Sequence, residues 1–331
     1  MIRLGTVGTS AICSKFLSGV RLTDEFILSA VYSRKKETGL SFAKENNCET
    51  VFTDLKEMAE SGLIDAVYIA SPNAFHKSQC EIFLNNNIHV ICEKPIVTNA
   101  DDYIFLKNKA DKNSLVFMEA IIPIFSKQYN LIKQALKEIG KIEMAKINFC
   151  QRSSRLDSFL SGQKVNIFDM SLHAGTLNDL GVYCVYGACD LLGIPKNIEA
   201  ESYFFSNGAD KSGYALFDYG DFPALLTYSK SCQSDTGSEI IGSDGTLKIS
   251  MISQYSGVTL IKSGKEKEIF STPSKAELMS GEAQKFADFI LNLEENEKEY
   301  NEKSDLCLNV HRCMDLIKQK SGLKYPEIKK G

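Results

Sequence analysis

The chain has 331 residues, 44% of them hydrophobic and 24% charged, and its formal net charge is −4 at pH 7. A chain of this length has room for two domains. The slight excess of acidic groups offers no attraction to nucleic acid or to an anionic membrane, so we expect neither as a partner. No apolar run approaches the roughly 20 residues that cross a bilayer.

Histidine and cysteine usage bears on metal sites and on the cellular compartment. The four histidines have no metal-ligand spacing relative to each other, and we expect no metal. The ten cysteines are scattered, with no Cys-x-x-Cys pair. Disulfide frameworks are typical of small secreted chains, so these thiols favour a reducing, cytoplasmic location. The short apolar stretch after Arg3 is interrupted by glycine and threonine, which indicates a first strand rather than a signal peptide.

The first 120 residues alternate between strand and helix patterns. Five short segments are apolar on both faces and rich in Val and Ile, as buried parallel strands are. They are IRLGTV (2–7), FILSAVYS (26–33), DAVYIAS (65–71), HVICEK (89–94) and LVFME (115–119). Helical stretches lie between them, at 11–20, 74–87 and 100–113. The alternation predicts a doubly wound parallel sheet of the Rossmann type, in a domain spanning residues 1–120.

The pattern changes after residue 120. The predicted elements are, in chain order, a helix over 127–140, a strand over 141–151, a polar loop over 153–164, a helix over 175–193, strands between about 197 and 270, and helices near 277–294 and 303–320. Turn residues separate the later strands, which is typical of antiparallel pairing. We therefore expect a second α/β domain over 121–331 with a large, mostly antiparallel open sheet.

Ligands of an open parallel sheet bind outside the carboxyl ends of its strands. Small, polar or cationic residues follow four of the predicted strands at that edge. They are Gly8, Thr9, Ser10, Ala11 and Ile12 after the first strand, Ser33 and Arg34 after the second, Ser71, Pro72 and Asn73 after the third, and Glu93 and Lys94 after the fourth. One such cluster is ordinary for a loop, but four on one edge predict a cofactor site. His76 follows on a helix, either facing the cofactor end or as a hydrogen-bonded structural residue.

The first cluster is a variant of the Gly-x-Gly-x-x-Gly fingerprint of dinucleotide sites, with Gly8, Ser10 and Cys13 at the three positions. Serine is the smallest polar intrusion at the middle position, and its hydroxyl can donate to a phosphate. The helix that follows offers free N–H groups and a favourable dipole to an anion. The small Cys13 thiol is tolerable where the third glycine serves packing. The position between a strand and an amphipathic helix favours a working dinucleotide site.

The end of the second strand bears on the choice between NAD and NADP. An Asp or Glu at this place accepts hydrogen bonds from the ribose hydroxyls of NAD. Here Ser33 and Arg34 stand instead, followed by two lysines. A guanidinium suits the 2′-phosphate of NADP, so we expect NADP, with NAD as the alternative. A solvated basic loop is the other interpretation of these residues.

Several longer motifs, taken with "EKP" at 93–95 and "NDLGVY" at 178–183, resemble the Gfo/Idh/MocA family of oxidoreductases. The likeness covers nearly the full length and includes "IASPNAFHKSQCEIFLNNNIHVICEKP", "MEAIIPIFSKQ" and the terminal "IKQKSGLKYP". The resemblance implies a Rossmann domain followed by an α/β domain whose large open sheet often forms the oligomer interface. We accordingly expect a homodimer or homotetramer formed through the C-terminal sheet.

The resemblance also implies roles for three residues. Lys94 of "EKP" matches the lysine beside nicotinamide and substrate. Asp179 and Tyr183 match the family's Asp-x-x-x-Tyr pair, as in members similar to dimeric dihydrodiol dehydrogenase, glucose–fructose oxidoreductase and xylose dehydrogenase. The sequence departs from the family at Ser10 and at the glycine-rich run before the aspartate, which is His-Ala-Gly at 173–175 here. The second departure bears on substrate fit more than on chemistry.

The chemistry of these three residues is consistent with hydride transfer to or from a small-molecule substrate. Asp179 and Tyr183 are four residues apart, so on a helix they share a face and can point into an interdomain cleft. A tyrosine with an ordinary pKa near 10 is brought closer to working pH by an adjacent ammonium such as Lys94. Tyr183 as a packed core aromatic is the alternative.

The predicted function is an NADP-preferring oxidoreductase acting on a sugar, a polyol or a related hydroxyl or carbonyl compound. A non-catalytic, dinucleotide-sensing regulatory protein of the same fold is the rival. The intact set of Lys94, Asp179 and Tyr183 favours the enzyme, since a sensor needs no proton relay.

Overall fold

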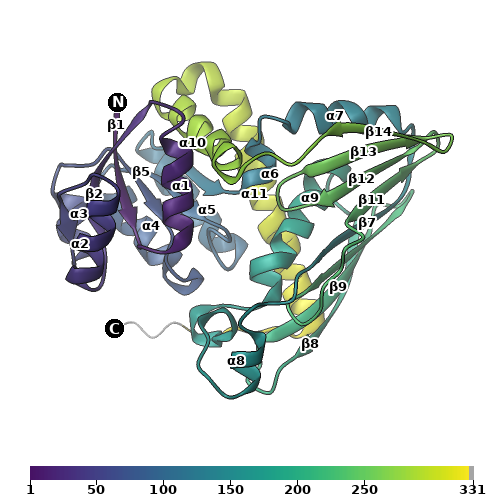
Figure 1. Ribbon diagram of the computed structural model, residues 1–331, viewed down its shortest axis with the longest axis horizontal. Helices are drawn as coiled ribbons and strands as arrows, with labels where there is room; N and C mark the ends of the chain where they lie inside the picture. Colours follow the sequence, from purple (N-terminus) through teal and green to yellow (C-terminus); the bar gives the residue numbers. More distant parts are fainter. Residues whose placement is uncertain (328–331) are drawn as a thin grey trace. The chain divides into compact units, whose positions relative to one another are not determined.

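The structure is a computed structural model and describes residues 1–327. The chain divides into two compact units, which alternate along the sequence. The first unit comprises Met1–Phe125 and Ser274–Asp305, and the second comprises Ser126–Pro273 and the residues from Leu306 onward. Each unit is built around its own sheet (Figure 1).

The sheet of the first unit is entirely parallel, with strand order β3-β2-β1-β4-β5-β6. Its strands are β1 (Ile2–Val7), β2 (Phe26–Tyr32), β3 (Val51–Phe52), β4 (Ala66–Ile69), β5 (His89–Glu93) and β6 (Phe117–Ala120). Its helices are α1 (Ala11–Val20), α2 (Lys36–Glu45), α3 (Leu55–Glu60), α4 (His76–Asn85), α5 (Ala100–Lys112), α6 (Ile122–Phe125) and α10 (Lys275–Leu291). This strand order confirms the predicted Rossmann architecture. The order reverses between β1 and β4, where ligands of such sheets bind.

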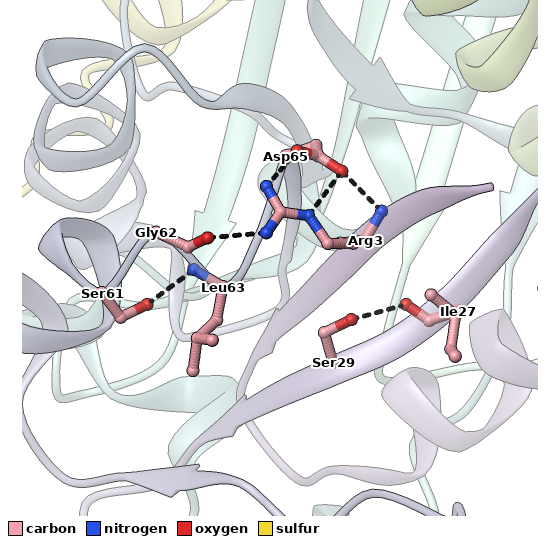
Figure 2. Close-up of polar contacts among 7 residues, drawn as sticks. All are labelled: Arg3, Ile27, Ser29, Ser61, Gly62, Leu63 and Asp65. Carbon is pink, nitrogen blue, oxygen red and sulfur yellow. Dashed lines mark hydrogen bonds and ion pairs between the residues drawn. The ribbon is translucent and has the colours of Figure 1, made fainter.

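The amino ends of β1 and β4 are clamped together by an ion pair. The Arg3 guanidinium donates to both carboxylate oxygens of Asp65, at 2.6 and 3.0 Å, and also to the carbonyl of Gly62. The backbone N–H of Arg3 donates to the same carboxylate, so one acid holds both the side chain and the strand (Figure 2). The clamp lies at the opposite end of these two strands from the predicted cofactor loops.

The second unit contains a mostly antiparallel sheet of strand order β14-β13-β12-β11-β7-β10-β9-β8. Its strands are β7 (Ile142–Cys150), β8 (Asn197–Phe204), β9 (Asp210–Asp218), β10 (Pro223–Ser229), β11 (Ser238–Gly242), β12 (Thr246–Met251), β13 (Ser256–Lys262) and β14 (Lys265–Phe270). The β7–β10 pair is parallel, and the other pairs are antiparallel. The helices of this unit are α7 (Tyr129–Glu138), α8 (Leu156–Leu160) and α9 (Val182–Leu192), and α11 (Leu293–Ser321) belongs to the first unit up to Asp305 and to the second from Leu306. This sheet confirms the predicted fold of the C-terminal half.

The two faces of this second sheet differ. Helix α9 packs on β7 and β10, against the buried Ala145, Ile147 and Leu226 of these strands. The alternate positions of the strands point to the other face, where Leu216 and Leu225 are opposite each other and about 40% exposed. Met144 and Tyr214 are exposed to the same degree. An apolar stripe therefore runs over β7, β9 and β10.

The observed elements differ from the sequence-based expectations in three places. Residues 274–305 belong to the first unit, whereas a boundary at residue 120 assigned them to the second, because α10 buries its apolar face on α1. The last helix begins at Leu293 rather than near 303, since Tyr300 packs on Phe289 and accepts a hydrogen bond from the N–H of Phe117. The polar loop over 153–164 contains the short helix α8, whose Leu156 enters a small apolar cluster around Phe168. Within residues 1–327, no helix combines the length and the apolar character needed to cross a membrane.

Candidate active site

The loop after β1 requires glycine at position 8. Gly8 adopts a φ of +111°, which side chains with a Cβ rarely do, and a Cβ there would lie 3.0 Å from the carbonyl oxygen of Ala70. The N–H of Ala70 donates to the carbonyl of Val7, so β1 and β4 meet directly beneath this turn. Gly8 therefore stands where the strand order reverses, as a dinucleotide fingerprint requires.

The helix after this turn begins with an open N-terminus. Ser10 is extended and exposed at the N-cap of α1, and its side chain makes no cap hydrogen bond to the helix. Its hydroxyl lies 3.8 Å from the Cys13 thiol. Burial raises the pKa of Cys13 to about 11, so the neutral thiol fills the packing position of the third glycine. The first-turn N–H groups and the Ser10 hydroxyl are thus suited to an anion such as a pyrophosphate.

The second and third clusters also stand at the carboxyl edge of the sheet. Ser33 is buried, and its hydroxyl accepts the N–H of Lys35, while Arg34 beside it is exposed. Ser71, Pro72 and Asn73 are half-exposed. The Ser71 hydroxyl donates to Gln79 of α4. Arg34 is accordingly an accessible cation of this edge next to β2, followed by the exposed Lys35 and Lys36.

His76 is fully buried and connects two of the loops. One ring nitrogen lies 2.8 Å from the carbonyl oxygen of Pro95, and the other lies 2.8 Å from that of Ser71. Burial lowers the pKa of this histidine, which favours the neutral ring. A neutral imidazole carries one N–H and donates to one of the two carbonyls. The buried His76 side chain therefore connects the loop of Ser71 with the loop of Pro95.

The loop that carries Lys94 is anchored on both sides of the lysine. Tyr68 of β4 donates to the Glu93 carboxylate at 2.6 Å, and Ile96 donates its N–H to the Glu119 carboxylate of β6 at 2.9 Å. Burial raises the pKa of Glu93, opposed by the positive charge of Lys94. Lys94 itself is half-exposed. Its backbone is thus fixed by neighbouring strands while its side chain reaches the surface of the unit.

Asp179 and Tyr183 lie on one helical segment of the second unit. A π-helical turn, Leu177–Gly181, carries Asp179 and continues into α9, which carries Tyr183. Such turns are rare and occur frequently at functional sites. Tyr183 is half-exposed and contacts the Phe149 ring edge-on at 5.8 Å, whereas Tyr186 on the same helix is fully buried. Tyr183 is therefore not a buried core aromatic.

The start of this segment is capped by an acid from a distant strand. The buried Asp210 of β9 accepts the N–H of Thr176 at 3.0 Å and that of Leu177 at 2.6 Å, one on each carboxylate oxygen. Gly175 adopts a φ of +153°, and a Cβ there would overlap the Asp210 carboxylate. Burial raises the pKa of Asp210. Gly175 of the His-Ala-Gly run is hence required by the cap rather than by the turn alone.

Asp179 is paired with a buried lysine that the sequence pattern did not reveal. Nζ of Lys230, just after β10, lies 2.7 Å from Oδ2 of Asp179. The Lys230 side chain is 4% exposed and that of Asp179 is 43% exposed. The carboxylate thus faces outward, with an ammonium behind it.

The predicted site residues fall into two groups. Every proposed cofactor residue and Lys94 lie in the first unit, and Asp179 and Tyr183 lie in the second. Sequence patterns did not predict Tyr68, Asp210 or Lys230. A tyrosine in an apolar strand carries no signal of its hydrogen bond, and neither Asp210 nor Lys230 belongs to a motif.

Known protein families match both halves of the chain. The family model described as an oxidoreductase family with an NAD-binding Rossmann fold matches residues 2–121, and the model of the GFO/IDH/MocA C-terminal domain matches residues 129–248. The chain is also 37% identical to scyllo-inositol 2-dehydrogenase (NADP(+)) IolU of Bacillus subtilis over 98% of this chain and 99% of that protein. This chain belongs to the Gfo/Idh/MocA family. It is an NAD(P)-dependent dehydrogenase or reductase, as expected from the resemblance.

More distant family relatives and solved structures cover most of the chain. Trans-1,2-dihydrobenzene-1,2-diol dehydrogenase of Xenopus tropicalis is 25% identical over 76% of this chain and 74% of that protein. KijD10, a 3-ketoreductase from Actinomadura kijaniata solved with NADP and TDP-benzene, has a TM-score of 0.83 at 21% identity, covering 97% of this chain and 98% of that one. Biliverdin reductase from Synechocystis has a TM-score of 0.80 at 17% identity, covering 97% and 99%. The last two likenesses show the shared fold.

Proposed function

We propose that this member of the family is an NADP-preferring oxidoreductase that transfers a hydride between nicotinamide and a sugar, a polyol or a related hydroxyl or carbonyl compound. The observation that carries the proposal is the set of Lys94, Asp179 and Tyr183, each only partly buried and each on an anchored element. The full-length similarity to an NADP-dependent inositol dehydrogenase supports both the cofactor and the polyol class.

The edge of the parallel sheet fits a dinucleotide. Gly8, Thr9, Ser10, Ala11 and Ile12 are all exposed or half-exposed at an uncapped helix start, where a pyrophosphate is favoured. Arg34 and Ser33 suit a 2′-phosphate. The remaining residues proposed for the cofactor are Ser71, Pro72, Asn73, His76, Glu93 and Lys94. His76 contributes by holding the loops of Ser71 and Pro95, since its ring is fully buried.

Side chains of the protein carry out the proton transfer that accompanies hydride transfer. When bound, NADP supplies or accepts the hydride at its nicotinamide ring. We assign to Tyr183 the donation of a proton to the reacting oxygen, or its removal, by the phenol. Lys94 supplies the positive charge that favours the phenolate, and it hydrogen-bonds the reacting oxygen. Asp179 accepts hydrogen bonds from substrate hydroxyls.

The cofactor preference is tested by titrating NADPH and NADH and following nicotinamide emission, which the absence of tryptophan leaves free of overlap with indole emission. We expect NADPH to bind more tightly. Arg34→Ala is expected to weaken NADPH binding by about tenfold, the loss of roughly 1.4 kcal/mol of charge-assisted hydrogen bonding, and to leave NADH binding nearly unchanged. Arg152→Ala, which removes an exposed arginine of the second unit, is the control. Tighter binding of NADH would overturn the preference.

The role of Tyr183 is tested by Tyr183→Phe. We expect turnover to fall by about 10²–10⁴-fold, the usual contribution of a positioned acid or base, with NADPH affinity unchanged. Tyr203→Phe, at an exposed tyrosine of β8, is the matched control and is expected to be neutral. Near-normal turnover of Tyr183→Phe would remove the phenol from the reaction.

The substrate class is tested with a panel of aldoses, inositols and dihydrodiols and either cofactor. Turnover of at least one member is expected. Silence across the panel, with intact NADPH binding, contradicts the proposed class and favours a sensor of the same fold.

We further propose that the protein forms a homodimer or homotetramer through the exposed apolar stripe of Met144, Tyr214, Leu216 and Leu225. Patches of this kind mark interaction surfaces in soluble chains. Leu216→Lys combined with Leu225→Glu is expected to yield monomers in light scattering after size-exclusion chromatography. An unchanged mass would place the interface elsewhere.

A further inference from the structure

Lys230 occupies an unusual position for a lysine. Its backbone follows β10, its N–H donates to the carbonyl of Lys211, and its carbonyl accepts the N–H of Ser153. Nζ lies 3.4 Å from the carbonyl oxygen of Ile167 and 5.5 Å from the centre of the Phe168 ring. The backbone of Lys230 is therefore fixed by two segments, and its ammonium lies against residues 167–168.

An enclosed ammonium needs negative charge nearby, because burial of an unpaired ion is costly. Two carboxylates provide it. Asp179 contacts Nζ directly at 2.7 Å, and the positive charge of Lys230 also acts on Asp210, where it opposes the effect of burial. Asp210 is committed to capping the helix through both oxygens. Asp179 is thus the partner that remains accessible to a ligand.

The pair is asymmetric in a way that matters for a reaction. Lys230 is 4% exposed and Asp179 is 43% exposed, so a ligand at this surface meets the carboxylate and not the ammonium. An ammonium at this distance favours the ionised carboxylate and restricts its rotation. The arrangement prepares one hydrogen-bond acceptor of fixed charge and direction beside Tyr183.

We propose that Lys230 is a positioning residue of the active site, which keeps Asp179 ionised and oriented toward substrate hydroxyls. This inference rests on the proposed function. It assigns the substrate a neutral, hydroxyl-bearing group at Asp179, because an anionic group would be repelled there. Lys230 makes its contribution through Asp179 and does not itself touch the reacting atoms.

The test is Lys230→Met, which keeps much of the chain length and removes the charge. We expect kcat/KM for the best substrate of the panel to fall by at least about tenfold. We also expect the acid limb of its pH profile to move to higher pH, with NADPH affinity unchanged. Lys230→Arg is expected to restore part of the activity. Lys146→Met, which removes an exposed lysine 3.8 Å from Glu239, is the control and should change neither quantity.

A double variant separates positioning from a merely structural role. Asp179→Asn combined with Lys230→Met is expected to be no slower than Asp179→Asn alone, because both changes act at one acceptor. Additive losses would overturn the proposal. So would a pH profile of Lys230→Met that falls in height without moving.

A measurement without turnover distinguishes this inference from the proposed function. Carboxyl-carbon NMR of protein labelled in aspartate, with Asp179→Asn to identify the signal, reports the Asp179 titration directly. We expect the midpoint to rise in Lys230→Met. Asp210 of β9 interacts electrostatically with Lys230, and Tyr228 of β10 and Tyr325 interact with Asp210 in turn. Tyr183 lies one helical turn from Asp179, and variants of Asp210 and of these three tyrosines identify any contribution to the curve. A shifted midpoint on a chain silent toward the panel would refute the substrate class alone, and an unshifted midpoint would refute the role of Lys230.

Discussion

The loop that carries Lys94 and the helix that carries Asp179 are held by different forces. Around Lys94 the anchors are hydrogen bonds with Tyr68, His76 and Glu119. These residues belong to β4, to α4 and to β6, all in the first unit. Around Asp179 the anchors are two buried charges, Asp210 and Lys230, from antiparallel strands far along the chain. Loss of one anchor in the first case leaves two others. In the second case loss of Asp210 leaves the N–H groups of Thr176 and Leu177 without their acceptor, and loss of Lys230 removes the ammonium behind Asp179.

The largest effect is expected from Gly175→Ala, which attacks the charged arrangement. The added methyl group overlaps the Asp210 carboxylate and meets a strained backbone at a φ of +153°. We expect a loss of unfolding free energy of about 2–4 kcal/mol, from overpacking and backbone strain together, in denaturant titration. Turnover should fall as well, since the helix of Asp179 and Tyr183 loses its cap.

Gly208→Ala is the matched control for this change. Gly208 has a φ of +86°, but a Cβ there meets no atom within 4 Å. Its cost is therefore backbone strain alone, about 1 kcal/mol, with normal turnover. Equal losses in the two variants would show that the contact with Asp210 is unimportant.

A smaller effect is expected from Tyr68→Phe in the first unit. The ring stacks on Phe16 at 3.9 Å between centroids and is retained, while the hydroxyl that donates to Glu93 is lost. We expect unfolding free energy to fall by about 1–2 kcal/mol, the cost of a buried acceptor without its donor. Turnover should change less than threefold or so, because His76 and Glu119 still hold the loop. A collapse of turnover would mean that the Lys94 loop depends on Tyr68 alone, which would contradict the view that three anchors share this task.

The smallest effect, and one that depends on pH, is expected from Glu282→Gln on α10. Neither carboxylate oxygen of Glu282 has a hydrogen-bond partner among residues 1–327, and burial raises its pKa well above the usual range. The folded chain therefore retains a proton that the unfolded chain releases above about pH 4.3. Stability from this group is full at low pH and lost as the pH rises.

Thermal unfolding between pH 5 and pH 8 measures this dependence. We expect the wild-type protein to lose about 1 kcal/mol or more relative to Glu282→Gln over that range. Parallel curves for the two proteins would contradict the expectation that folding changes the protonation of Glu282.

The sequence predicted those parts of the site that local patterns determine. Short buried strands and the loops that follow them can be recognised in a sequence. The β1 turn with Gly8, the exposed Arg34 and the Lys94 loop therefore lie at the carboxyl edge of the first sheet, as predicted. The four-residue spacing of Asp179 and Tyr183 likewise indicated a helix. Their roles toward cofactor and substrate stay predictions.

The remaining parts depend on contacts that no local pattern encodes. Lys230 looks like any residue at the end of a strand until the fold places it behind Asp179. Asp210 caps a helix that begins 34 positions earlier in the chain. The π-helical turn follows no periodicity that sequence reasoning tests. A hydrophobic stripe on α1 shows that something must cover it, but not that α10 does.

Because residues 274–305 belong to the first unit, that unit cannot be completed during synthesis until most of the chain has been made. Gly19 of α1 approaches α10 so closely that a Cβ there would lie 2.6 Å from the Met279 backbone, and Phe26 stacks on Phe286. A nascent chain that has reached residue 125 therefore carries the parallel sheet without the helix that covers α1. All eight strands of the second sheet are synthesised before that helix. An excised half meant to stand alone needs residues 1–125 joined to 274–305, because truncation after residue 125 leaves α1 bare.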